Sequence, residues 1–265
     1  MIDRNFKPRQ SKQDYKTHRV PEKQMIFGIR AILEAIEAGK DFDKIFLRRD
    51  MSSDLGRQLI AKLNGVPTPI VRVPVEKLNQ MTDKNHQGAI AFISPIQFSN
   101  IETLIPTLFE EGKTPTIVVL DGVTDVRNIG AIARTCSCTG VDALLIPNRG
   151  TASITADAIK TSAGALHTLP VCRTDNLSQT IKYLRDCGLQ VIAATEHTST
   201  NYTKADFKQP LALVMGSEDV GISDDILKLA TQKVRIPMQG TIESLNVSVA
   251  AGVILYEIVR QRGIE

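Results

Sequence analysis

Polar side chains able to bind and orient a phosphate ester gather in three short segments of the second half of the sequence. The segments are residues 121–134, 216–223 and 236–248, and the first two directly follow apolar runs. Open parallel sheets place their ligands beyond the carboxyl ends of their strands, so these loops predict one shared site. The side chains that single out the three segments are Asn128, Arg134, Glu218, Ser244 and Asn246.

Each segment alone also has a simpler structural interpretation. Asn128 could cap a helix, and residues 216–223 could be an ordinary strand-to-helix turn with Ser223 as its cap. Ser244 could likewise hold the first turn of the last helix. Arg134 lies in a small and apolar stretch (AIARTCS), so it needs a partner, which could be a structural carboxylate or a phosphate.

The sequence carries no signature of covalent or metal chemistry. No nucleophile and base stand at a recognisable spacing, and neither a P-loop nor a GxGxxG turn occurs. The four cysteines form no CxxC pair and have no histidine at ligand spacing, so we expect no metal site. They are too few for a disulfide framework, which fits a reducing cytoplasm. We therefore expect a site that binds and orients a cofactor and a phosphate ester.

The composition is that of a folded chain without a membrane span. Of the 265 residues, 42% are hydrophobic and 23% charged, which is enough apolar content for real cores. No apolar run reaches the ~20 residues that cross a bilayer, and no secretory signal stands at the N-terminus. A net charge of +3 permits nucleic-acid binding without proving it.

Strands alternate with helices from residue 116 onward, which predicts a parallel α/β domain. Three of the expected strands are continuous apolar runs, as in strands that are buried on both faces of a sheet. We expect strands at 117–120, 143–146, 189–194, 211–215 and 233–236, and helices at 129–139, 155–165, 177–186, 224–230 and 245–262.

The rest of the chain divides into an arm, a smaller α/β domain and a connector. Residues 1–23 carry seven basic and three acidic residues without periodicity, which indicates a flexible basic arm or simply a solvated tail. Residues 24–95 alternate strands and helices and predict a small substrate-binding domain. Residues 96–115 read as a linker with one helix, and 116–265 form the larger domain.

Together, the three motifs resemble those of the SpoU/TrmH family of RNA ribose 2′-O-methyltransferases, in the SPOUT superfamily. The motifs occur in the family's order, as Asn128-x-Gly130 with Arg134, then GSEDVG at 216–221, then IPM at 236–238 leading to SLNVS at 244–248. Asp219 departs from the family pattern by adding a second acid beside Glu218. The preceding block resembles the ribosomal-protein-like substrate-binding domain of the 23S ribosomal RNA guanosine branch.

The resemblance implies a fold and a reaction that periodicity alone does not. The fold would be a parallel sheet with a C-terminal trefoil knot, and the enzyme a homodimer with its sites at the interface. The cofactor would be S-adenosylmethionine, and the product a 2′-O-methylated ribose, most specifically a guanosine of 23S ribosomal RNA. The alternatives are a tRNA or ribosomal adenosine as target, or a non-catalytic RNA-binding ribosome-assembly factor.

By motif match, the resemblance also assigns residues to roles. Gly216, Ile236, Met238 and Leu245 would contact the cofactor. Arg134 would stand at the target phosphate and hydroxyl, with Asn128, Glu218, Ser244 and Asn246 completing the catalytic set. A guanidinium stays protonated in proteins, so a phosphate oxygen or water could take the proton while Arg134 orients. Glu218 would hold Arg134 or Asn128 in place. In the first domain, the candidates for gripping RNA are Arg30, Lys44, Arg48 and Arg49.

Overall fold

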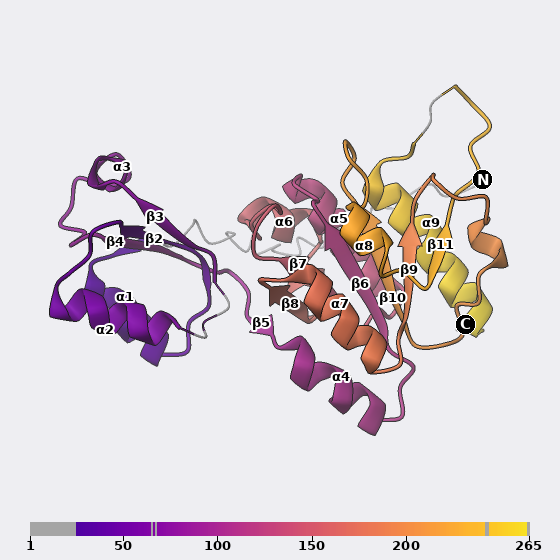
Figure 1. Cartoon of the computed structure of the whole chain (residues 1–265), viewed down its shortest axis with the longest axis horizontal. Coiled ribbons are helices and arrows are strands. Elements are labelled where there is room, and N and C mark those ends of the chain that lie inside the picture. Colours follow the sequence, from indigo (N-terminus) through magenta and orange to yellow (C-terminus); the bar gives the residue numbers. More distant parts are fainter. Residues whose placement is uncertain (1–24, 65, 67, 242–243, 264–265) are drawn as a thin grey trace, which may run out of the picture.

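A computed structural model describes residues 25–64, 66, 68–241 and 244–263, and folds them around two separate sheets (Figure 1). The basic arm expected at residues 1–23 lies outside the described residues. No helix in the described part of the chain is long and apolar enough to cross a membrane.

The smaller, N-terminal sheet has four strands in the order β1-β4-β2-β3. Helices α1 and α2 pack their apolar stripes on one face of this sheet, around the fully buried Phe42, Ile45 and Leu47. The short helix α3 packs on the opposite face through Leu78 (Figure 1). The elements are β1 Met25–Phe27, α1 Ile29–Glu37, β2 Phe42–Arg48, α2 Asp54–Leu63, β3 Ile70–Val73, α3 Val75–Asn79 and β4 Ala89–Ile93.

The larger sheet has seven strands, all parallel, in the order β11-β9-β10-β6-β7-β8-β5. This arrangement confirms the expected parallel α/β fold with a smaller α/β domain before it. Its strands are β5 Phe98–Ser99, β6 Thr116–Asp121, β7 Ala143–Pro147, β8 Val171–Thr174, β9 Gln190–Ala194, β10 Leu211–Gly216 and β11 Gln232–Val234.

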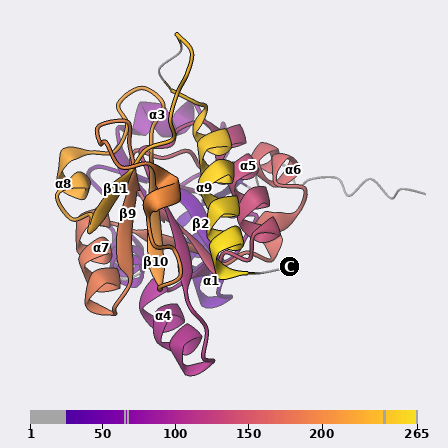
Figure 2. The ribbon, with the colours of Figure 1, turned by 90° about the vertical axis from the view of Figure 1, so that its right-hand side faces the viewer.

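Helices cover both faces of the larger sheet, as the apolar runs of β6, β9 and β10 require. One face packs against α5, α6 and α9, and the other against α4, α7 and α8 (Figures 1 and 2). The helices are α4 Ile101–Glu110, α5 Val126–Cys138, α6 Ala156–Thr161, α7 Leu177–Asp186, α8 Asp224–Leu227 and α9 Val247–Arg262.

Two short strands of this sheet were not expected from the sequence. β8 lies between β7 and β5, and β5 belongs to the segment that reads as a linker. In the same segment, α4 buries Ile101, Ile105 and Leu108 in the core of the larger domain. Residues 98–110 therefore pack as part of the larger domain rather than as a free connector.

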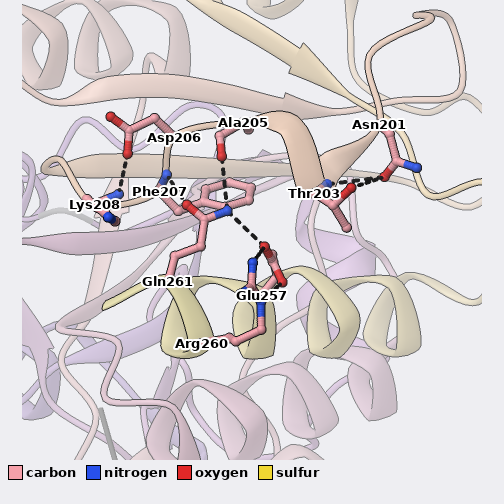
Figure 3. A network of polar contacts seen from close by, with 9 residues as sticks. All are labelled: Asn201, Thr203, Ala205, Asp206, Phe207, Lys208, Glu257, Arg260 and Gln261. Atoms are coloured by element: carbon pink, nitrogen blue, oxygen red, sulfur yellow. Dashed lines mark hydrogen bonds and ion pairs between the residues drawn. The ribbon is translucent and has the colours of Figure 1, made fainter. Parts of the chain in front are cut away.

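The carboxyl-terminal half of α9 is tied to the segment that precedes β10 (Figure 3). Gln261 accepts a hydrogen bond from the Phe207 amide at 3.0 Å and donates to the Ala205 carbonyl at 3.0 Å. Glu257 accepts two hydrogen bonds from Arg260 and one from Gln261, which fixes the Gln261 amide. The Arg260 hydrogen bond holds the pKa of the Glu257 carboxyl below its usual range.

Arg262 extends this anchoring to the start of the central strand. Its guanidinium donates to the carbonyls of Phe207, Gln209 and Thr114 at 2.9 Å, and to the Thr116 hydroxyl at 2.7 Å. One half-buried side chain thus joins α9 to β6 and to the segment before β10. Because α9 supplies Ile254, Leu255 and Ile258 to the core, this clamp stabilises the whole larger domain.

We expect Arg262→Ala to lower the free energy of unfolding by about 2–4 kcal/mol, because it leaves several carbonyls without their charged donor. Lys228→Ala is the control, since its exposed ion pair with Asp225 should be worth no more than ~0.5 kcal/mol. Urea unfolding followed by circular dichroism measures both. Equal midpoints for the two variants would show that Arg262 is no clamp.

Candidate active site

The site lies at the carboxyl ends of the neighbouring strands β6 and β10. Asp121 and Gly216, the last residues of these strands, pair in register. The loop after β6 leads into α5, which carries Asn128, and the loop after β10 carries Glu218. The start of α9 brings Asn246 to the same place. Three segments far apart in sequence thus meet at one edge of the sheet, as their positions after strands predict.

Asn128, Glu218 and Asn246 form one hydrogen-bonded group, here called the amide–carboxylate cluster. Asn128 Nδ2 donates to Glu218 Oε1 at 3.0 Å, and Asn246 Nδ2 donates to the same oxygen. Asn246 Nδ2 also lies 3.0 Å from Asn128 Oδ1. The carboxylate therefore fixes both amides, and each helix start is held against the loop after β10.

Capping explains how the two asparagines reach the cluster. Asp125, not Asn128, caps α5, because its Oδ1 accepts the Arg127 amide hydrogen at 2.7 Å. Asn128 is therefore inside the helix, buried, with its side chain free to meet Glu218. Asn246 caps α9 through Oδ1, which accepts from the Ser248 amide at 3.0 Å, while its Nδ2 serves the cluster. The two helices are thus capped by Asp125 and Asn246, and the alternative interpretation of Asn128 and Ser244 as caps does not hold.

A cavity of about 390 Å³ opens beside Glu218, between the loops that follow β9, β10 and β11. The volume of this cavity lies within the range of small-molecule sites. Ser244, in the segment before α9, is part of the cavity wall. The lining includes every residue assigned by resemblance to the cofactor: Gly216, Ile236, Met238 and Leu245.

Gly216 is required by its own loop rather than by a ligand alone. A Cβ added there would stand 2.2 Å from the Gly221 carbonyl carbon and 2.4 Å from the Ile222 nitrogen. The loop is a tight hairpin in which Ser217 and Gly221 exchange backbone hydrogen bonds of 3.1 and 3.0 Å. Any side chain at Gly216 would therefore displace the hairpin that presents Glu218.

Asp121 holds the other end of this hairpin. Its Oδ2 accepts hydrogen bonds from the Ser223 amide and the Ser223 hydroxyl, both at 2.8 Å. Ser223 precedes α8, as expected, but its hydroxyl bonds to Asp121 and does not cap the helix. The last residue of β6 thereby fixes the loop of its neighbour β10.

Arg134 lies outside the cluster. It sits six residues after Asn128 on α5, exposed on another side of the helix, and no hydrogen bond or ion pair joins it to any other described residue. Gly130, between the two, lets α5 approach α6, since a Cβ there would stand 2.6 Å from the Ala158 carbonyl oxygen. Within one chain, the structure joins Asn128, Glu218 and Asn246 but leaves Arg134 apart.

Other residues of the cavity wall were missed from the sequence. Thr195, Glu196 and His197 follow β9 and line the cavity, and Ala250 lines it from α9. Thr195, Glu196 and His197 could have been predicted, because they directly follow a strand that the sequence indicates. The loop at 148–162 does not line this cavity, and Thr151 of that loop donates to the Val123 carbonyl at 2.9 Å.

The thiols take no part in this site. Cys136 and Cys172 are buried in the core of the larger domain. Burial raises the pKa of the Cys172 thiol to about 12, and it also raises the pKa of Cys136. In the part of the chain that the structure describes, no group of three or more histidines, cysteines or acids is placed to hold a metal ion.

Comparison with known proteins identifies the family. Residues 115–256 match the model of the SpoU rRNA Methylase family, and residues 25–99 match that of RNA 2′-O ribose methyltransferase substrate binding. A relative from Staphylococcus saprophyticus, assigned to the TrmH family of tRNA/rRNA methyltransferases, is 33% identical over 91% of this chain and 97% of its own. The chain belongs to the SpoU methylase family.

Solved structures agree with this membership. The SpoU methyltransferase AviRb from Streptomyces viridochromogenes, in complex with AdoMet, is 26% identical with a TM-score of 0.58, over 91% of both chains. An AdoMet-bound rRNA methyltransferase from Sinorhizobium meliloti is 25% identical, with a TM-score of 0.58 over 89% of this chain and 86% of its own. This SpoU protein is thus an RNA 2′-O-ribose methyltransferase that uses S-adenosylmethionine.

The cavity fits this cofactor in its chemistry. Ile236, Met238 and Leu245 line the cavity with apolar surface that a flat base could pack against, and Gly216 lies in the same lining. When bound, S-adenosylmethionine supplies a methyl group already activated on a sulfonium. What remains for the chain is to align the acceptor hydroxyl and to stabilise charge as the hydroxyl proton leaves.

We expect Asp121→Ala to weaken S-adenosylmethionine binding by about tenfold, because the hairpin that lines the cavity loses two hydrogen bonds to a carboxylate, on the order of 1–3 kcal/mol. Isothermal titration calorimetry measures the dissociation constant. Asp142→Ala is the matched control: this carboxylate accepts the Thr116 amide at 2.9 Å, at the opposite end of the same strand. An equal loss of affinity in both variants would mean that Asp121 acts through stability alone.

Proposed function

We propose that this protein methylates the 2′-hydroxyl of a guanosine in 23S ribosomal RNA, acting in the cytoplasm as a homodimer. The observation that carries the proposal is the amide–carboxylate cluster at the rim of the cofactor cavity. The two-domain layout supports a ribosomal target, because a substrate-binding domain precedes the catalytic one, whereas tRNA enzymes of the family often lack it. The C-terminal trefoil knot remains part of the proposal.

In the proposed site, Asn128 and Asn246 orient the ribose and the target phosphate, with Glu218 holding both amides. Ser244 stands at the same wall of the cavity. Arg134 stabilises the phosphate and the developing charge on the 2′-oxygen. As the methyl group would pass from the sulfonium to the 2′-oxygen, the sulfur–methyl bond would break and leave S-adenosylhomocysteine. The hydroxyl proton would go to a phosphate oxygen or to water, because a guanidinium stays protonated.

The position of Arg134 supports a dimer. Val249 and Tyr256 on α9 are large apolar side chains that are 52% and 57% exposed. Gly252 lies between them on the same helix stripe and faces Thr135 of α5, the neighbour of Arg134. Figure 2 shows α9 and α5 side by side at the surface. A second copy that covers this α5–α9 surface would bury the apolar pair and give Arg134 a site to complete.

The proposed RNA contacts of the first domain are spread over two sides. Lys44 and Arg48 lie on one face of β2, and Arg49 follows this strand. Arg30 lies on α1, which packs against the opposite face. Arg48 is also paired with Asp50 at 3.0 Å. Lys44 and Arg49 are thus the stronger candidates for contacts with the phosphate backbone.

The direct test of the target uses purified protein with tritiated S-adenosylmethionine and separate pools of unmodified ribosomal RNA and tRNA. Digestion of the product to nucleosides locates the methyl group. We expect 2′-O-methylguanosine from the large-subunit RNA. Label in tRNA or on an adenosine would move the substrate to one of the alternatives. Cofactor binding without transfer to either pool would favour a non-catalytic assembly role.

We expect Arg134→Ala to lower the rate of methyl transfer by about a hundredfold or more, as when a group that stabilises transition-state charge is removed. The affinity for S-adenosylmethionine should stay within about twofold. Arg127→Ala is the matched control, because Arg127 is on the same helix, its side chain is 80% exposed, and among the described residues it pairs only with Asp125. A near-normal rate in the Arg134 variant would remove it from the catalytic set.

We expect the double variant V249E/Y256E to sediment as a monomer and to lose methyl transfer, because two charges cannot be buried without partners. Analytical ultracentrifugation measures the mass. Phe109→Glu, at an exposed apolar position on α4, should leave the dimer unchanged. A monomeric wild type, active on its own, would refute the dimer.

A further inference from the structure

A buried ion pair joins the two domains. Arg173, on β8 of the catalytic sheet, places Nη2 3.1 Å from Oδ1 of Asp43, on β2 of the N-terminal sheet. The two side chains are only 3% and 5% exposed. Neither residue of the pair lines the cavity beside Glu218.

The same guanidinium makes three further contacts across this junction. Arg173 Nη1 donates to the carbonyl oxygens of Phe42 at 3.0 Å and of Asp43 at 3.3 Å. Its plane lies over the ring of Phe98, with 3.8 Å between the guanidinium carbon and the ring centroid. One side chain of the catalytic domain is therefore held by a carboxylate, two carbonyls and an aromatic ring.

The segment between the domains is fixed at the same point. The Phe98 amide donates to Asp41 Oδ2 at 2.9 Å, and β5, which contains Phe98, pairs with β8 beside Arg173. The start of β2, the interdomain strand β5 and the catalytic strand β8 thus meet around one arginine.

Such a contact resists bending of one domain against the other. Domains joined by a short segment move by default unless their interface is specific and well packed. Here, any rotation would separate the buried Asp43 carboxylate from the Arg173 guanidinium, and pulling two buried, paired charges apart is strongly unfavourable. Lysine could not replace the arginine, because the planar fork and the stacking on Phe98 are properties of guanidinium.

We propose that Arg173 is a positioning residue that fixes the RNA-binding domain relative to the methyl-transfer site and thereby selects the target nucleotide. The inference rests on the proposed function. RNA held by the N-terminal domain reaches the amide–carboxylate cluster at a set distance, so the angle between the domains decides which ribose arrives there. Misplacement by about 1 Å is enough to cost a hundredfold in rate.

The test compares wild type with Arg173→Ala and Arg173→Lys, and uses Arg185→Ala as the control. Arg185 is an exposed arginine of the same domain, and its one weak hydrogen bond, to the Leu229 carbonyl at 3.5 Å, stays within that domain. Small-angle X-ray scattering reports the arrangement of the domains. Calorimetry reports cofactor affinity, and tritium transfer to an unmodified 23S ribosomal RNA transcript, with the methylated position mapped, reports target selection.

We expect the Arg173→Ala protein to bind S-adenosylmethionine within about twofold of wild type and to scatter as a more extended particle. We also expect it to methylate the target nucleotide at least tenfold more slowly, or to place methyl groups at additional positions of the transcript. Arg173→Lys should fall between, and Arg185→Ala should match wild type. If Arg173→Ala does not fold, as lost cofactor binding would show, Arg173→Lys and Asp43→Asn decide the question, since both keep most of the packing.

Wild-type scattering and a wild-type methylation pattern in both Arg173 variants would overturn the inference. A failure of the proposed function would give a different set of results. Wild type that binds no cofactor or methylates no RNA would refute the function, and with it the role in target selection. A change in scattering on Arg173→Ala would in that case still show that this arginine holds the domains together.

Discussion

A single carboxylate oxygen holds together the candidate active site of this SpoU protein. Glu218 Oε1 accepts hydrogen bonds from two asparagine amides that are 118 residues apart in sequence. It can do so only because β6 and β10 are neighbours in the sheet and end at the same level. Gly216 and the Asp121 carboxylate then determine the conformation of the loop that presents Glu218. The position of the Glu218 carboxylate therefore depends on the backbone packing of that loop.

This organisation separates two kinds of residue. Side chains that belong to the fold of the loop, such as Gly216 and Asp121, are satisfied within a single chain. Arg134 is not, because it is exposed on α5 without a polar partner among the described residues. Within a single chain, the Asn128 and Asn246 amides of the site are therefore held in place, whereas the Arg134 guanidinium lies outside the site. That incompleteness is the physical argument for a second copy.

Much of the fold could be predicted from the sequence, because strands that are buried on both faces of a parallel sheet consist of continuous apolar residues. The runs of β6, β9 and β10 are continuous and apolar, and they define the sheet. β8 was missed because it is only four residues long and its last two residues, Arg173 and Thr174, are polar and break the apolar run. β5, with two residues, has no pattern to read.

The site was less accessible to prediction, since residue type does not distinguish a cap from a cluster member. Asp125 and Asn128 are both good caps by type, and only the geometry shows that the first caps α5 and the second reaches Glu218. Arg173 carries no local signal at all, because its partner Asp43 is 130 residues away. Contacts between distant segments are set by the packing of whole domains, which local patterns do not encode.

The late position of α9 has a consequence for how the protein is made. Residues of this helix complete the core around Val118 and Leu120, and Arg262 closes the contact with the start of β6. During synthesis, the N-terminal domain has all its strands early and can fold first. The catalytic sheet, in contrast, keeps one apolar face partly uncovered until α9 has been translated. The nascent catalytic domain therefore passes through a stage at which this apolar face lacks the cover that α9 later provides.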